Sequence, residues 1–227
     1  MKSIKLLILK ACASPALKIH CTLQIFIFVF VLTMANVANA SCTYSLVDGT
    51  EKVTWTGFKF TEKTGVSGTF DDLKVKSEAS DSLEGLLKSI DFEIDTKSLN
   101  SGNPARDATL KKTVFAFLSI PETIKGSVQS ATEEDLDVQM TVNEKMNAKF
   151  DYTAKDSKLS ALGAINLTQS GLMRSYNAVK EACKILHTGA DGVSKTWSDV
   201  EIKLEANYEE KCSKGIIESV KDWFGSK

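Results

Sequence analysis

The feature that most constrains the fold is an alternation of apolar and polar residues at every second position, which runs from residue 43 onward. In the clearest segment the apolar residues are Val200, Ile202, Leu204, Ala206 and Tyr208, with charged or amide residues between them. A strand with this period buries one face and exposes the other to water, which is typical of antiparallel sheets. Similar segments lie at 44–46, 53–60, 66–70, 90–94, 124–128, 136–142, 146–152 and 159–167.

These segments predict the fold class. Short polar breaks, such as 144–145 and 154–157, separate neighbouring segments and favour hairpins. About eight strands suffice to close a small barrel. We therefore expect a mainly β protein, an antiparallel β-barrel of about eight strands with two or three short flanking α-helices.

Three stretches change to a helical period. The first, 104–117, begins with Asn103 and Pro104, an N-cap followed by proline at the first helical position. The second ends at Gly189 and carries a helical stripe of Leu172, Tyr176, Val179, Cys183 and Leu186. The third, 216–224, is amphipathic. We expect this helix to pack over a barrel end; the alternative is a helix that docks on a membrane surface or a partner.

The first forty residues have the pattern of an export signal. Four lysines and no acidic residue precede the apolar run 25–32, and Ala38-Asn39-Ala40 follows as a small-x-small site. This pattern predicts a secretory signal peptide cleaved after Ala40. The apolar stretch is shorter than the roughly 20 residues that span a bilayer. A lipid anchor on Cys42 is disfavoured, because Asn39 stands where a lipobox has leucine.

The expected organisation is therefore a signal peptide at 1–40, a barrel domain at 41–212 and a C-terminal amphipathic helix at 213–227. Export leaves three cysteines in the mature chain, and an oxidising compartment favours pairing two of them. We favour Cys183–Cys212, with Cys42–Cys212 as the next choice. No pair of cysteines has metal-site spacing. His187, the one histidine after residue 40, is interpreted as a surface residue.

Charge and motifs exclude several function classes. The net charge of −1 divides into a basic leader and a remainder with 24 basic and 29 acidic residues, which argues against nucleic-acid binding. The sequence has no Gly-x-Ser-x-Gly elbow, phosphate-binding glycine loop or His-Glu-x-x-His pair. We expect no catalytic residues and no metal site. An enzyme acting on a lipid head group is the minor alternative.

The apolar faces of the strands mix large residues with small ones, for example Phe150 with Ala148. Such a mixture either interlocks to fill the barrel or leaves a slot along its axis. Composition alone does not decide between these two packings.

Two stretches resemble the YceI-like family. Residues 66–70, Val-Ser-Gly-Thr-Phe, are similar to its Val-x-Gly-x-Phe element. Residues 89–98, followed by Ala105-Arg106-Asp107, Leu110 and Phe115-Ala-Phe117, resemble its strand, its Arg-Asp-x-x-Leu helix and its paired aromatics. The resemblance covers roughly residues 43 to 208. After Leu167 the sequence departs from the family pattern, so the family's contacts to a ligand head group cannot be assigned to residues of this chain.

The resemblance implies a lipocalin-like barrel in the bacterial periplasm that holds a polyisoprenoid or isoprenoid-quinone-like lipid, with no other cofactor. The implied partner is this apolar ligand and no nucleic acid, while transient membrane contact and a homodimer stay open. The alternative is a structural or stress-response binding module with a filled barrel. We expect Phe115 and Phe117 to border the entrance, and the ligand to be lined by Trp55, Phe70, Phe92, Ile94, Val138, Met140, Phe150, Ile165 and Ile202.

Overall fold

The computed structural model describes residues 41–119, 122–169 and 171–213, nearly all of which belong to one compact unit, Cys42–Lys211. The predicted signal peptide and nearly all of the predicted C-terminal helix lie outside the described residues. No helix within these ranges is long and apolar enough to cross a membrane. The described residues form one antiparallel sheet of β1 (Cys42–Leu46), β2 (Lys52–Lys59), β3 (Thr64–Phe70), β4 (Leu73–Lys76), β5 (Asp91–Asp95), β6 (Leu99–Asn100), β7 (Thr123–Ala131), β8 (Asp135–Thr141), β9 (Lys145–Lys155), β10 (Lys158–Asn166) and β11 (Thr196–Cys212).

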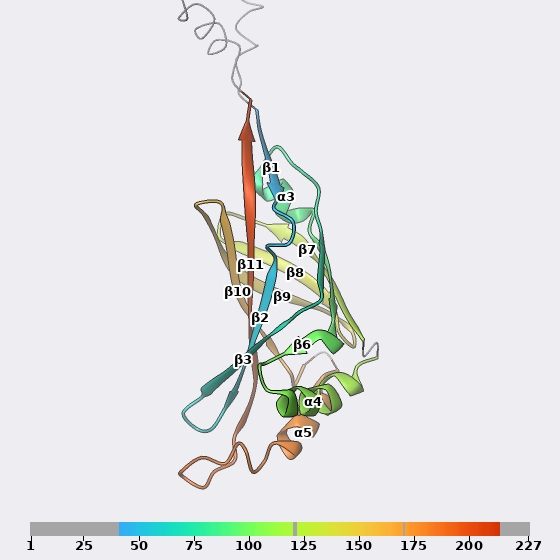
Figure 1. The fold of residues 1–227 in the computed structure, drawn as a ribbon, viewed down its shortest axis with the longest axis vertical. Coiled ribbons are helices and arrows are strands. Elements are labelled where there is room, and N and C mark those ends of the chain that lie inside the picture. The colour runs from blue at the N-terminus through green and yellow to red at the C-terminus, as the bar shows by residue number, and fades with distance from the viewer. Residues whose placement is uncertain (1–40, 120–121, 170, 214–227) are drawn as a thin grey trace, which may run out of the picture. The chain divides into compact units, whose positions relative to one another are not determined.

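The sheet curls round on itself (Figure 1). Its two terminal strands are β4 and β6, and each is joined through the chain to a strand near the opposite end of the sheet. From β2 the hydrogen-bonded order runs through β11, β10, β9, β8 and β7 to β5. Strands β3 and β4 are separated only by Asp71 and Asp72; β3 pairs with β2 and β6, and β4 pairs with β5. The chain itself therefore completes the ring. With β3–β4 and β5–β6 each counted as one bent strand, the antiparallel barrel of about eight strands is confirmed.

Each of the nine segments predicted as strands contains a strand, and β1 lies outside the ring, paired with β11. The period-two pattern succeeds because almost every strand has one face turned inward. Strand β9 is the clearest case, since Met146, Ala148 and Phe150 are buried while the residues between them are exposed. The core is contributed mainly by β7, β8, β9 and β10.

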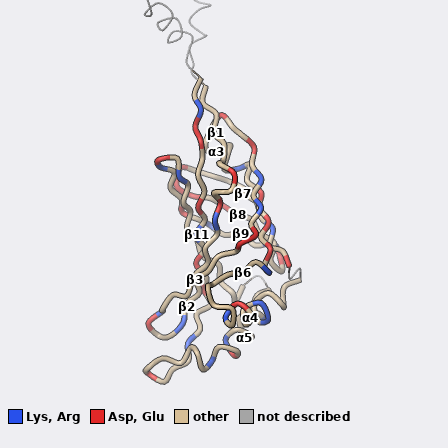
Figure 2. The backbone as a smooth tube through the Cα atoms, viewed as in Figure 1, with Lys and Arg blue, Asp and Glu red and all other residues tan. Residues whose placement is uncertain are grey.

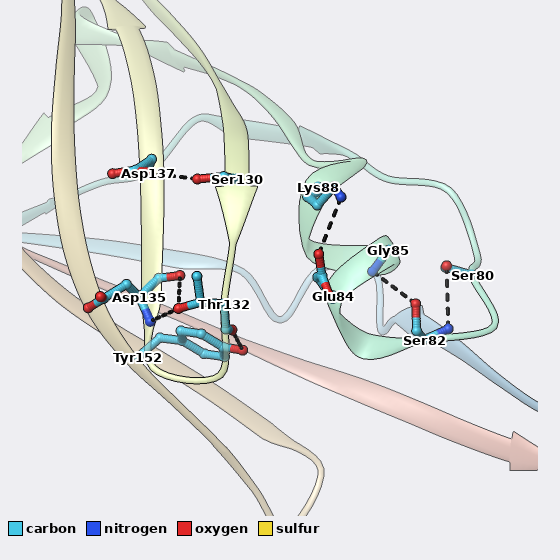
Figure 3. Close-up of polar contacts among 10 residues, drawn as sticks. All are labelled: Ser80, Ser82, Glu84, Gly85, Lys88, Ser130, Thr132, Asp135, Asp137 and Tyr152. Carbon is cyan, nitrogen blue, oxygen red and sulfur yellow. Dashed lines mark hydrogen bonds and ion pairs between the residues drawn. The ribbon is translucent and has the colours of Figure 1, made fainter.

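One end of the barrel carries α3 (Leu83–Lys88), which the sequence pattern did not predict. Six residues are too few for a recognisable helical period. Ser82 caps the helix, its Oγ accepting a hydrogen bond from the Gly85 N–H at 3.2 Å, and Leu86 and Leu87 are buried (Figure 3). Beside it, the Tyr152 hydroxyl donates to the Thr132 carbonyl at 2.6 Å and ties β9 to the β7–β8 turn.

The opposite end carries α4 (Pro104–Thr113) and α5 (Met173–Ala182) (Figure 1). The predicted start of α4 is confirmed, since Asn103 Oδ1 accepts from the Arg106 N–H at 3.1 Å. The predicted end at residue 117 is wrong. The last residues form a separate 3₁₀ turn, Phe115–Phe117, which closes with Leu118 N–H on the Phe115 carbonyl. Helix α5 also ends earlier than expected, with Cys183 as its C-cap.

Charged residues are distributed along the strands and loops (Figure 2). Between β5 and β7, Lys125 Nζ lies 3.0 Å from Glu93 Oε2, and this hydrogen bond is the main reason that the pKa of Glu93 is lowered. Both side chains are exposed, so the pair contributes little to stability. Neither residue of this pair lines the cavity of the barrel.

Candidate functional site

The barrel encloses a cavity of about 610 Å³. Of the two packings that composition allowed, the structure has the open slot. The nine residues expected to line a ligand all lie on the wall of this cavity, as does Phe115. Phe117 lies off the wall, its ring 4.3 Å from the Arg174 guanidinium. Whether the wall residues contact a ligand stays a prediction.

Three aromatic residues keep the lumen open by lying against glycines on the neighbouring strand. Trp55 is the cross-strand partner of Gly68, and a Cβ built on this glycine falls 2.5 Å from Trp55 Cζ2. The same relationship holds for the pairs Phe92–Gly126 and Phe150–Gly163. A ring that covers a glycine lies along the sheet instead of projecting across the barrel. The mixture of large and small residues therefore builds a wall and not a filled core.

Helices α4 and α5 contribute a part of the cavity wall that the strands do not form. The stripe recognised in the sequence faces inward, because Leu172, Val179, Cys183 and Leu186 all line the cavity. Ser175 is fully buried and its hydroxyl donates to the Val114 carbonyl at 2.8 Å, which fixes α5 against the end of α4. Sequence reasoning missed Leu87 of α3 and Leu99 of β6, because these elements are too short to show a period.

The α5 end of the cavity has a polar group of three residues. Lys59 of β2 is the cross-strand partner of Thr196 of β11, and Thr196 Oγ1 lies 2.7 Å from His187 Nδ1. All three residues line the cavity. The interpretation of His187 as a surface residue is wrong: the ring is half-buried because the 183–195 segment folds back onto the barrel. Burial, and secondarily the Lys59 charge, lowers the pKa of His187, which favours the neutral imidazole.

Arg106 of α4 also lines this end of the cavity. Its Nε donates to Ser101 Oγ at 2.8 Å and its Nη2 to the Ser101 carbonyl at 3.0 Å. Asp107 accepts from the Ser101 N–H at 3.0 Å, so Ser101 connects the two charged residues. These two hydrogen bonds hold the guanidinium in place at the wall of the cavity.

The predicted Cys183–Cys212 disulfide is wrong. Cys183 is a buried free thiol, whereas Cys42 and Cys212 are the disulfide-bonded cysteines. The physical reason is the orientation of α5, whose apolar stripe turns Cys183 toward the cavity. Burial raises the pKa of the Cys183 thiol. The disulfide that is present fits an oxidising compartment.

One buried donor on the wall has no acceptor. Trp55 is buried, and its Nε1 has no hydrogen-bond partner among the described residues. A buried N–H without a partner costs about 1–3 kcal/mol. Together with the apolar walls, this arrangement is suited to holding a molecule by burial of its surface, with a few polar groups at one end.

No curated protein matches the chain by sequence. Solved structures with a similar fold include a polyisoprenoid binding domain from Saccharophagus degradans, at 13% identity over 76% of this chain and 100% of that one, with a TM-score of 0.48. BcnA from Burkholderia cenocepacia follows at 12% identity over 72% and 99%, with a TM-score of 0.44. The Campylobacter jejuni YceI protein has 15% identity over 66% and 86%, with a TM-score of 0.43.

The family assignment depends on the sequence match to a domain model. The YceI-like domain matches residues 44–208, which include the strands of the ring, with β11 as far as Tyr208, and both helices at the α4–α5 end. YceI-like proteins are binding proteins and not known enzymes. The chain belongs to the YceI-like family.

Proposed function

We propose that this protein is an exported, periplasmic lipid-binding protein that holds a polyisoprenoid or isoprenoid-quinone-like chain in its barrel. The observation that carries the proposal is the apolar cavity of about 610 Å³ inside a YceI-like domain. Its volume falls in the range of small-molecule sites. The YceI-like resemblance supplies the class of ligand, and the cavity supplies the space for it.

Burial of apolar surface is sufficient to hold such a ligand. Moving an isoprenoid chain from water to an apolar lumen gains about 25 cal/mol for each Å² removed from water. Along the middle of the barrel the wall is aliphatic and aromatic, with Val138, Met140 and Phe150 from β8 and β9. Specificity then comes from the length and width of the lumen, and the polar residues at the α5 end meet whatever group terminates the chain.

Export is supported by two independent features. The basic leader and the small-x-small site at Ala38–Ala40 are the pattern of a cleaved signal peptide. The disulfide-bonded Cys42 and Cys212 are consistent with an oxidising compartment. Carriage or storage in the periplasm is the role that fits both features.

The proposal is tested by extracting the purified protein with organic solvent and identifying bound lipid by mass spectrometry. Ala161 and Ala164 provide a matched pair on β10, because Ala161 is buried on the cavity wall and Ala164 is exposed. We expect Ala161→Phe to fill the lumen and release the lipid, and Ala164→Phe to retain it. Ala161→Leu is a milder version, in case the phenylalanine prevents folding.

A stoichiometric isoprenoid in the wild-type extract that disappears in the Ala161 variants supports the proposal. A wild-type extract free of lipid, or equal lipid content in the Ala161 and Ala164 variants, contradicts it. A lipid-free protein would favour the alternative of a structural or stress-response binding module.

A further inference from the structure

Exposed apolar side chains gather on the segment between α5 and β11, which Figure 1 draws in orange below α5. Ile185, Leu186 and Val193 are 88%, 70% and 48% exposed, and they make up three of the five large hydrophobic residues that are exposed in the described part of the chain. We call these three residues the apolar tip. Single exposed hydrophobic residues are ordinary, whereas a cluster marks an interaction surface.

The apolar tip is carried on a braced loop. The two sides of the loop are joined by the Lys195 N–H on the His187 carbonyl at 3.0 Å and by Ser194 Oγ on the Lys184 carbonyl at 2.8 Å. The β2–β3 turn supports it from the side, since Thr61 Oγ1 donates to Asp191 Oδ2 at 2.7 Å. The loop therefore presents its apolar residues in a fixed arrangement instead of burying them by collapse.

Basic residues are in excess in the chain segments next to the apolar tip. Residues 59–64 and 173–197 contain six basic residues and three acidic ones, although the chain after residue 40 is acidic overall. One of the three acids is engaged internally, since Asp191 accepts from Thr61 and from the Val193 N–H. The Lys63 and Lys195 ammonium groups lie 5.1 and 4.7 Å from the centre of the Trp197 ring. This end thus combines protruding apolar side chains with a local excess of positive charge.

The apolar tip is continuous with the cavity. Leu186 is largely exposed and also lines the cavity, together with its neighbours Cys183 and His187. The surface of the loop therefore passes directly into the lumen at this residue. A lipid chain leaving the cavity beside Leu186 would reach the apolar tip without first entering bulk water.

We propose that the apolar tip and its basic surround dock on the surface of an anionic lipid bilayer. A few apolar side chains with basic neighbours suit the boundary between headgroups and acyl chains. A stable protein partner would need about 800 Å² of contact on each side, more than three side chains supply. The purpose of docking, to pass lipid between bilayer and cavity, rests on the proposed function. The docking itself does not.

The experiment measures cosedimentation of the full chain with vesicles of phosphatidylcholine and phosphatidylglycerol in equal amounts, and with phosphatidylcholine alone. The double variant Ile185→Ser/Val193→Ser removes apolar tip residues that do not line the cavity. Leu162→Ser is the matched control, because Leu162 is 46% exposed on the outer face of β10. Any contribution of residues 1–40 and 214–227 to binding is common to all variants.

We expect the double variant to bind anionic vesicles about tenfold or more weakly than wild type, from the lost burial of two side chains. Leu162→Ser should bind like wild type, and added salt should weaken binding. Equal binding by the double variant and wild type, or equal binding to neutral and anionic vesicles, overturns the proposal. Lipid extracts of the same samples keep the two proposals separate, since a lipid-free protein that docks through the apolar tip contradicts only the carrier function.

Discussion

The indole ring of Trp55 lies directly over Gly68, its partner on the neighbouring strand, so closely that there is no room for a side chain at residue 68. A Cβ there falls 2.5 Å from Trp55 Cζ2 and 2.7 Å from the Asn100 carbonyl oxygen. The same pairing of ring and glycine occurs at Phe92–Gly126 and Phe150–Gly163. The width of the lumen therefore depends on glycines whose neighbours are aromatic.

Gly68→Ala is expected to push the Trp55 ring toward the lumen and to press on the Asn100 backbone. The cost of overpacking is about 1–3 kcal/mol in the free energy of unfolding, measured by urea denaturation, with a parallel loss of bound lipid. Gly57→Ala on β2 is the control, because a Cβ at Gly57 meets nothing within 4 Å. An equal loss of stability in the two variants would contradict the role assigned to the ring–glycine contact.

Trp55→Phe removes the buried Nε1–H that has no partner in the described residues. The gain from deleting an unsatisfied donor, about 1–3 kcal/mol, opposes the loss of packing from the smaller ring. We expect a net change in unfolding free energy well below the ~3–5 kcal/mol that a Trp→Ala substitution costs in a core. Urea denaturation of Trp55→Phe beside Trp55→Ala measures both, and comparable losses in the two variants would show that the indole N–H is not a liability.

The pH dependence of stability should report on His187. The folded-state pKa lies below its ordinary value near 6.5, with burial as the larger cause and the Lys59 charge as the smaller one. As the pH falls below about 6.5, the unfolded chain binds the proton first, so stability is full above that pH and decreases until the folded-state pKa is passed. No other histidine lies after residue 40.

The measurement is the unfolding free energy of wild type and His187→Gln between neutral and mildly acidic pH. We expect the difference between the two proteins to change with pH in this window, with wild type losing stability faster on acidification. A constant difference across the window would show that the His187 pKa is the same in the folded and unfolded states.

The sequence predicted the inner face of the barrel well, because one-sided burial forces a period of two on each strand. Trp55, Val138 and Phe150 lie on the cavity wall for this reason. What the period cannot supply is the register between strands. Placing Gly68 opposite Trp55 requires knowing which residues pair across β2 and β3. The choice between a filled and an open lumen depended on that register and could not be made from one strand at a time.

The two wrong predictions, for Cys183 and His187, share one physical cause. The Cys183–Cys212 pairing follows from the expected oxidising compartment alone, whereas the position of Cys183 in the α5 stripe turns its thiol inward. His187 is expected at the surface because it is a lone histidine near the glycine turn at Gly189, yet the loop that follows it folds back and His187 meets Thr196. In both cases the decisive contact joins residues of different elements, and no local pattern contains it.

Cys183 offers a direct probe of the cavity. Its thiol is buried and its pKa is raised, so little reactive thiolate is present near neutral pH. We expect iodoacetamide to modify Cys183 much more slowly in the native protein than in urea, and more slowly still when lipid occupies the cavity against which the thiol lies. Mass spectrometry of the alkylated peptide gives the rate, and Cys183→Ser reports labelling elsewhere. The disulfide-bonded Cys42 and Cys212 stay unmodified without reductant. Fast labelling of Cys183 in the native protein would mean that α5 leaves the barrel readily. An identical labelling rate with and without lipid would place the ligand away from this end of the cavity.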